Sequence, residues 1–132
     1  MQNFAKEIKD LHQFFEDYLS GKLPADDLTP FESVLDSGFT IVTSDGAVMT
    51  YDDIVGYVRD GHNQRPDFTI WTENVALKQH VNGMVVATYE EWQRINGVTT
   101  SRTSTVVFKE DADARNSVIW LHVHESGLKE VD

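Results

Sequence analysis

The chain has 132 residues, no cysteine, and 22 acidic against 11 basic residues, which give a formal net charge of −11. The lack of cysteine excludes disulfides and thiolate metal sites, and the acidic excess disfavours nucleic acids and anionic membranes as partners. The length predicts one domain over residues 1–132, and no apolar window approaches the roughly 20 residues that span a bilayer. We therefore expect a cytoplasmic protein that binds neither nucleic acid nor membrane.

The N-terminal part is predicted to be helical. Apolar side chains at spacings of three and four predict an amphipathic helix over residues 3–20, which Gly21 ends. Thr29, followed by a proline, predicts the start of a second, short helix that ends near Ser37.

A short strand pair and a third helix are expected next. Residues 39–43 and 48–49 read as strands that flank a tight turn. Thr50 with Asp53 three residues later forms an acidic version of the capping box, so it predicts the start of a helix that Gly61 closes.

The second half reads as a strand meander. Its segments are rich in β-branched and aromatic residues, which suit a half-buried pleated surface; they cover residues 68–81, 84–95, 98–109 and 117–125. Asn82-Gly83 and Asn96-Gly97 predict two-residue hairpin turns, and Asn74 marks a bulge or bend in the first segment. Early helices followed by late strands predict an α+β fold, with helices packed on one face of a curved antiparallel sheet.

The second hairpin turn, Asn96-Gly97, predicts the strand register, in which Glu91 lies opposite Arg102. If Ser104 then lies opposite His122 on the last strand, alternation gathers a polar cluster on one face. Its members are Tyr89, Glu91, Arg102, Ser104, Trp120, His122 and His124. A polar, titratable cluster that grades into apolar positions is typical of the mouth of a ligand pocket.

His122 and His124 are the candidate catalytic residues of this cluster. They occupy alternate positions of one strand, and histidine titrates near neutral pH, so either can act as a general acid or base. The same pair can instead be a hydrogen-bonded pocket lining or, with Glu91, a divalent metal site. We expect no bound metal and no cofactor.

The remaining members of the cluster are candidate ligand-binding residues. Arg102 is either the structural ion-pair partner of Glu91 or an anchor for a ligand carboxylate, and both roles can hold together. Tyr89 and Trp120 are interpreted equally as pocket walls and as core residues, and Ser104 lies between them on the predicted face.

The opposite sheet face carries alternating apolar residues that would need cover. The side chains assigned to it are Trp92, Thr105, Ile119, Leu121 and Val123. A second copy of the chain is the simplest cover, so the sequence predicts a homodimer.

Three local patterns carry a family resemblance: the block from Leu35 to Val55 (LDSGFTIVTSDGAVMTYDDIV), the segment TYEEW at 88–92, and WLHVHE at 120–125. With the order of elements, they resemble the nuclear transport factor 2-like superfamily, and within it the SnoaL-like domains of unknown function. The resemblance implies a cone-shaped, cystatin-like fold that is commonly dimeric and holds ligands between the helices and the concave sheet face. Members include isomerases, cyclases, dehydratases, binders and accessory domains.

Two functions follow as expectations. The first is a domain that binds a small, largely apolar organic molecule, with or without an anionic group. The alternative is an isomerase, dehydratase or cyclase that uses His122 or His124 as its general acid–base. The sequence leaves open whether the molecule is turned over.

Overall fold

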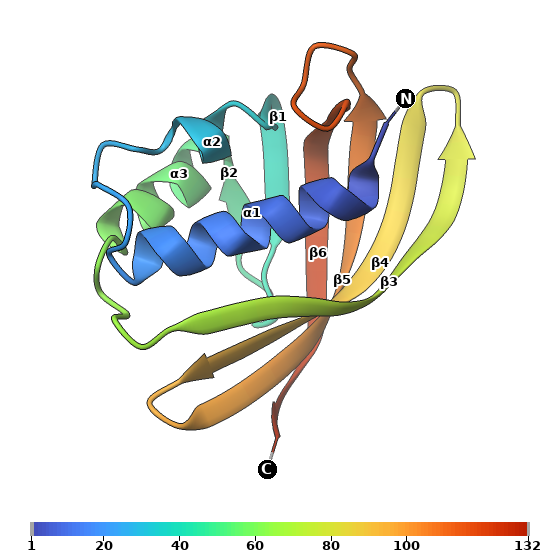
Figure 1. The fold of residues 1–132 in the computed structure, drawn as a ribbon. Helices are drawn as coiled ribbons and strands as arrows, with labels where there is room; N and C mark the ends of the chain where they lie inside the picture. Colours follow the sequence, from blue (N-terminus) through green and yellow to red (C-terminus); the bar gives the residue numbers. More distant parts are fainter. Residues whose placement is uncertain (1, 132) are drawn as a thin grey trace.

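A computed structural model describes residues 2–131, which contain three helices and six strands (Figure 1). The elements are α1 (Phe4–Leu19), α2 (Thr29–Glu32), β1 (Leu35–Val42), β2 (Val48–Thr50), α3 (Tyr51–Asp60), β3 (Thr69–Val81), β4 (Met84–Ile95), β5 (Val98–Glu110) and β6 (Val118–Val131). All strands join one sheet in the order β2-β1-β6-β5-β4-β3. None of the described helices is long and apolar enough to cross a membrane.

Helix α1 lies across one face of the sheet because one side of it is apolar (Figure 1). Asn3 caps its first turn by accepting a hydrogen bond from the Lys6 N–H. Ile8, Leu11 and Tyr18 are buried in the core, where each large side chain contributes roughly 1.5–3 kcal/mol. This packing holds α1 over the strands that carry the polar residues.

A buried carboxylate ties α1 to the far end of the sheet. The Glu7 side chain is fully buried and accepts hydrogen bonds from Arg115 Nε at 2.8 Å and Nη2 at 2.9 Å. Asn116 Nδ2 and Trp120 Nε1 also donate to it, at 3.0 and 2.9 Å. These donors offset the free-energy cost of burying the carboxylate. The contacts therefore join α1 to the loop before β6 and to β6 itself.

The second helix is shorter than predicted. It ends at Glu32 instead of near Ser37, and β1 begins at Leu35. The Trp120 N–H donates to the Val34 carbonyl at 2.9 Å, and Leu35 pairs with Trp120. Pairing with β6 therefore draws this segment into the sheet, and β1 runs parallel to β6 while the other strand pairs are antiparallel.

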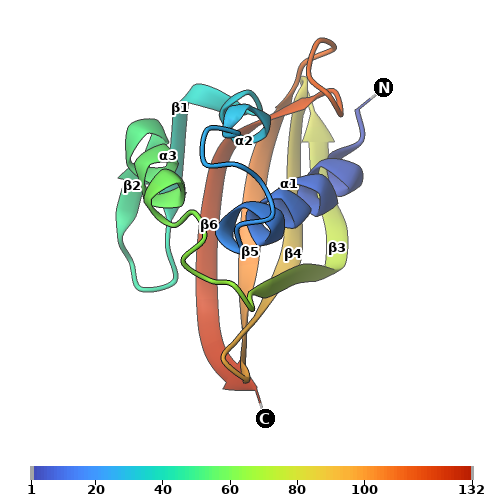
Figure 2. The same cartoon turned by 60° about the vertical axis from the view of Figure 1, so that its left-hand side comes forward.

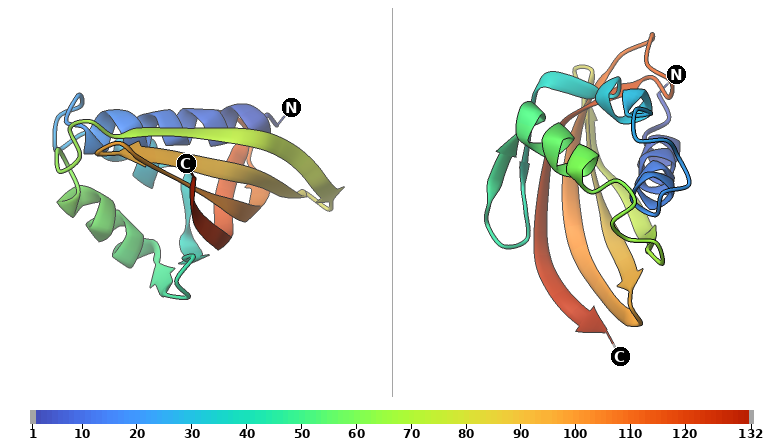
Figure 3. Two further views of the ribbon diagram at one scale, coloured as in Figure 1. Left: turned by 90° about the horizontal axis from the view of Figure 1, so that it is seen from below. Right: turned by 90° about the vertical axis from the view of Figure 1, so that its left-hand side faces the viewer.

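The sheet curls toward the helices, as the turned views show (Figures 2 and 3). Both predicted hairpin turns form, and φ is positive at Asn82, Gly83, Asn96 and Gly97, as a type I′ turn requires. The predicted irregularity in β3 is present between Glu73 and Ala76, where the register shifts. The predicted class, helices packed on a strongly curved and largely antiparallel sheet, is confirmed.

The β4–β5 register is confirmed, but the predicted β5–β6 register is wrong. Glu91 pairs with Arg102 as expected, whereas Ser104 pairs with Glu125 instead of His122. A register shift between Val107 and Phe108 leaves one extra residue on β6.

This bulge changes which face each β6 side chain occupies. It lets both Trp120 and Val123 face the core, where they are 2% and 4% exposed. Because alternation restarts at the bulge, His122 and His124 lie on the outer face, and Val123 does not belong to the predicted outer set.

Candidate functional site

A cavity of about 500 Å³ lies between the helices and the concave side of the sheet. Most of its wall is apolar and comes from α1, α3, β1 and the start of β3; it includes Phe15, Leu19, Ile41, Ile54, Val58, Phe68 and Ile70. The strands β4, β5 and β6 add a polar group made of Glu91, Gln93, Arg102 and Glu125. The cavity is thus largely apolar with a charged region on the sheet, and Asp45 and Arg65 add two more charged side chains to its lining.

Glu91 is the centre of the charged region. Its side chain is 9% exposed, and it accepts hydrogen bonds from Gln93 Nε2 at 2.6 Å and from His12 Nε2 at 3.0 Å. Burial raises the pKa of Glu91, but the hydrogen bond and charge of His12, together with Arg102, outweigh it and hold the pKa below its usual range. Glu91 is therefore an ionised, fixed carboxylate at neutral pH.

His12 reaches Glu91 from α1. Its Nδ1 lies 2.7 Å from the Ile8 carbonyl oxygen, which can only accept, so Nδ1 carries a proton. Its Nε2 lies 3.0 Å from Glu91 Oε1, so the ring is held between the helix backbone and this carboxylate. His12 also lines a second cavity of about 370 Å³ between α1 and β3, and it therefore stands between the two cavities.

Arg102 faces two carboxylates without a close hydrogen bond to either. Its Nε lies 3.5 Å from Glu91 Oε2, and its Nη1 lies 3.7 Å from Glu125 Oε1. Charge-assisted hydrogen bonds are usually about 2.7–2.9 Å long, and the buried Nε has no hydrogen-bond partner among residues 2–131. The side chain is 16% exposed, so Arg102 has unused donors beside the cavity.

Glu125 is the second carboxylate and differs from Glu91. Burial is the main cause that raises its pKa, and the negative charge of Glu91 adds to it; Arg102 and His12 act in the opposite direction. The resulting pKa is about 7. Glu125 therefore gains or loses a proton near neutral pH, which makes it a candidate acid–base group.

Three predicted cluster members point inward but pack in the core. Tyr89, Ser104 and Trp120 are all less than 4% exposed, and none is among the described residues that line the two cavities. Burial, followed by the charges of Glu91 and Glu125, raises the pKa of Tyr89 well above its usual value. Ser104 Oγ is buried without a hydrogen-bond partner in the described chain.

The two candidate catalytic histidines lie away from the cavity. His122 Nδ1 is 2.8 Å from Thr40 Oγ1, and the His122 and His124 ring centroids are 6.4 Å apart on the outer face. Within the described residues, no group of three or more histidine, cysteine, aspartate or glutamate side chains is arranged to hold a metal ion.

Sequence reasoning missed three members of the charged group. His12 follows Ile8 by four residues, so it lies on the apolar face of α1. A polar residue at a buried helix position is the sequence signal that could have identified His12 as a site residue. Gln93 lies two residues after Glu91 on the inward face. Glu125 shares that face with Val123, but only the correct β6 register reveals it.

The curved sheet with helices on its concave side is the nuclear transport factor 2-like fold, which solved structures share. The chain belongs to the sequence family described as Sucrose-6-phosphate phosphohydrolase C-terminal, which matches residues 4–129. No curated protein matches the chain.

Solved structures show the same fold. An NTF-2-like protein of unknown function from Pseudomonas aeruginosa superposes with a TM-score of 0.86 at 25% identity, covering 93% of this chain and 96% of that one. ActVI-ORFA from Streptomyces coelicolor gives 0.62 at 17% identity, with 93% of both chains covered. The CaMKII hub of S. rosetta gives 0.69 at 16% identity, covering 87% of this chain and 88% of that one.

Proposed function

We propose that residues 1–132 act as one domain whose cavity binds a small, largely apolar organic molecule through an anionic group held by Arg102. The observation that supports this proposal most strongly is that the Arg102 guanidinium makes no close hydrogen bond to its two carboxylate neighbours. Its buried Nε has no hydrogen-bond partner in the described chain, and its carboxylate neighbours lie at 3.5 and 3.7 Å. The terminal nitrogen Nη1, which lies 3.7 Å from Glu125, is the donor that a ligand carboxylate would use.

The family name suggests a phosphorylated sugar as another ligand. The cavity favours the apolar anion, because its wall is mostly apolar and two carboxylates flank Arg102. A phosphate dianion would bring two negative charges against Glu91 and Glu125. Glucose 6-phosphate is therefore expected to bind more weakly than an aromatic carboxylate of similar size.

The test compares an acid with its neutral amide. At about pH 6, calorimetric titration should show 2-naphthoate binding the wild type more tightly than 2-naphthamide. The Arg102→Gln variant should lose about 10- to 100-fold in affinity for the acid and little for the amide, because only the acid uses the guanidinium. His122→Gln on the outer face is the matched control and should change neither value.

Equal losses for acid and amide in Arg102→Gln would return Arg102 to a structural role. A circular dichroism melt of each variant separates loss of binding from loss of folding.

Glu125 supports a second candidate, an enzyme that moves a proton on its substrate. A carboxyl with a pKa of about 7 beside a cavity is suited to general acid–base work. The candidate base is then Glu125 instead of His122 or His124, since neither histidine lines the cavity. Proton exchange of 2-tetralone in heavy water would report it, with a loss of about 10²–10⁴-fold expected for Glu125→Gln.

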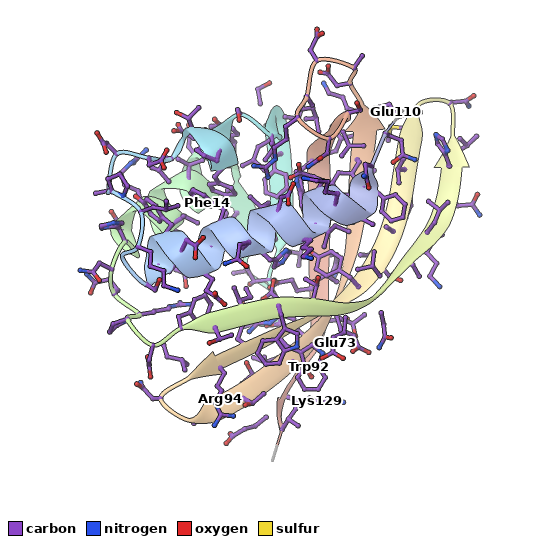
Figure 4. The ribbon with its side chains drawn as sticks, viewed as in Figure 1. Phe14, Glu73, Trp92, Arg94, Glu110 and Lys129 are labelled. Atoms are coloured by element: carbon purple, nitrogen blue, oxygen red, sulfur yellow. The ribbon has the colours of Figure 1, made fainter. Side chains whose placement is uncertain are left out.

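We also propose that the chain forms a homodimer through its outer sheet face. Trp71 and Trp92 pair across β3 and β4 with stacked rings, 6.0 Å between centroids. Figure 4 shows Trp92 beside Glu73 and Lys129 on the lower part of the sheet, apart from Phe14 near α2. Half-buried aromatic rings on an open sheet face are typical of a contact surface.

A further inference from the structure

Three charged side chains from three strands meet at the charged region of the cavity, and His12 on α1 contacts one of them. Arg102 on β5 lies between Glu91 on β4 and Glu125 on β6, at 3.5 and 3.7 Å. His12 on α1 joins from the far side of Glu91. Asp45 in the β1–β2 turn and Arg65 after α3 also line the cavity.

The two carboxylates are held unequally. Glu91 accepts side-chain hydrogen bonds from His12 and Gln93, at 3.0 and 2.6 Å. Glu125 meets Arg102 only at the longer distance of 3.7 Å, and its side chain is 11% exposed. Glu91 is therefore fixed by two side-chain hydrogen bonds. Glu125 is held by the Ser44 backbone and meets Arg102 only at the longer distance, so a ligand anion can replace it as the counter-charge of Arg102.

We propose that the ligand is an organic monoanion, of the apolar carboxylate class, that displaces Glu125 from Arg102 and is bound together with one proton taken up by Glu125. The inference rests on the proposed function of the cavity and names its ligand class and specificity residue. Above about pH 7, Arg102 is balanced before binding by the Glu125 carboxylate. After binding, it is balanced by the ligand carboxylate, the proton comes from solvent, and Glu125 is a neutral carboxylic acid.

Electrostatics favour this exchange. A ligand anion that entered beside two ionised glutamates would place three negative charges around Arg102. Protonation removes one of these charges, and the neutral acid can donate its O–H to the ligand carboxylate. The Glu125 pKa of about 7 in the empty cavity makes the proton uptake inexpensive near neutral pH.

The linkage gives a defined pH dependence. Below about pH 7, Glu125 already carries the proton, so affinity for the acid should be constant there. Above this pH the proton must be taken up, so affinity should fall up to about tenfold per pH unit. The neutral amide needs no such exchange, and its affinity should not vary with pH.

The experiment is calorimetric titration of 2-naphthoate into the wild type, at about pH 6 and about pH 8.5. At the higher pH the titration is repeated in two buffers of different ionisation enthalpy, which reports the protons taken up per ligand. The wild type should lose roughly 10- to 30-fold in affinity between the two pH values and take up close to one proton at the higher one. Glu125→Gln, which imitates the protonated state, should bind with the same high affinity at both.

Two outcomes would overturn the inference while leaving the proposed function standing: a pH-independent affinity of the wild type for the acid, or a pH dependence that persists unchanged in Glu125→Gln. Failure of both 2-naphthoate and 2-naphthamide to bind at either pH would overturn the proposed function and this inference with it. 2-Naphthamide is the ligand control, and its affinity should be the same at both pH values. His122→Gln is the protein control, and it should keep the wild-type pH dependence for 2-naphthoate.

Discussion

At the scale of single residues, the site depends on two glutamates whose pKa values move in opposite directions. Glu91 is fully enclosed but hydrogen-bonded to His12 and Gln93, and its pKa is lowered. Glu125 has no such side-chain hydrogen bond within residues 2–131 and meets only the Ser44 backbone and Arg102; burial, followed by the charge of Glu91, raises its pKa to about 7. The difference comes from the donors each carboxylate meets, since both lie on neighbouring parts of the same sheet face.

The raised pKa of Glu125 predicts a loss of stability with rising pH. The folded chain holds a proton that the unfolded chain releases near pH 4.5, so the free energy of unfolding falls between about pH 4.5 and pH 7. Glu125→Gln removes this loss. The free energy of unfolding of Glu125→Gln, relative to that of the wild type, should rise by about 3 kcal/mol between about pH 4.5 and pH 8.

Urea unfolding at about pH 4.5 and about pH 8 measures this difference. Glu91 has the opposite sign, because its lowered pKa gives stability that is present at neutral pH and lost in acid. A difference between Glu125→Gln and wild type that stays constant with pH would contradict the assignment.

Some of the candidate site could be predicted from residues alone. Glu91 and Arg102 were placed correctly because the local Asn96-Gly97 turn determines their pairing. His122 and His124 were misplaced because the loop 111–117 does not define a register, and because the bulge on β6 has no clear signature in the sequence.

At the scale of elements, local signals predicted most boundaries, and contacts distant in sequence decided the rest. Thr50 and Asp53 form the predicted reciprocal capping box at the start of α3. The predicted second helix is longer than α2 because Leu35, which the prediction placed in the helix, pairs with Trp120 of β6, 85 positions later in the chain. Tertiary pairing outweighed the local helix signal there.

Two glycines provide an element-scale prediction. Gly97 has φ +78°, and a Cβ at this position would contact nothing, so Gly97→Ala measures backbone strain alone. It should lower the free energy of unfolding by about 1 kcal/mol. Gly56 lies within α3 with equal space, so Gly56→Ala should raise it by about 0.5–1 kcal/mol. Urea unfolding of both variants should give opposite signs, and the same sign for both would contradict the turn geometry.

At the scale of the whole molecule, the concave side of the sheet encloses the cavity and the outer side remains open. The outer face carries the stacked pair of Trp71 and Trp92. Within the described residues, the helices lie on the concave face (Figure 3). We therefore propose a different role for each face: the concave face binds the ligand, and the outer face forms the homodimer.

The homodimer proposal predicts a mass in solution of twice the 15.0 kDa chain. Trp92→Glu should shift the wild type toward the single-chain mass, because it places a charge in a desolvated contact. Val48→Glu on the edge strand β2, where Val48 is 68% exposed, is the control and should not change the mass. Light scattering that gives the single-chain mass for the wild type would reject the dimer.

The central claim, that Arg102 anchors an anion inside the cavity, is tested most directly by nuclear magnetic resonance of the arginine Nε–H and tryptophan Nε1–H groups. On titration with 2-naphthoate, the signal of the Arg102 Nε–H, which is buried and has no hydrogen-bond partner among residues 2–131, should move until the site is saturated. The signals of Trp71 and Trp92 on the outer face should stay in place. An unmoved Arg102 signal, with the tryptophan signals shifting instead, would contradict the account.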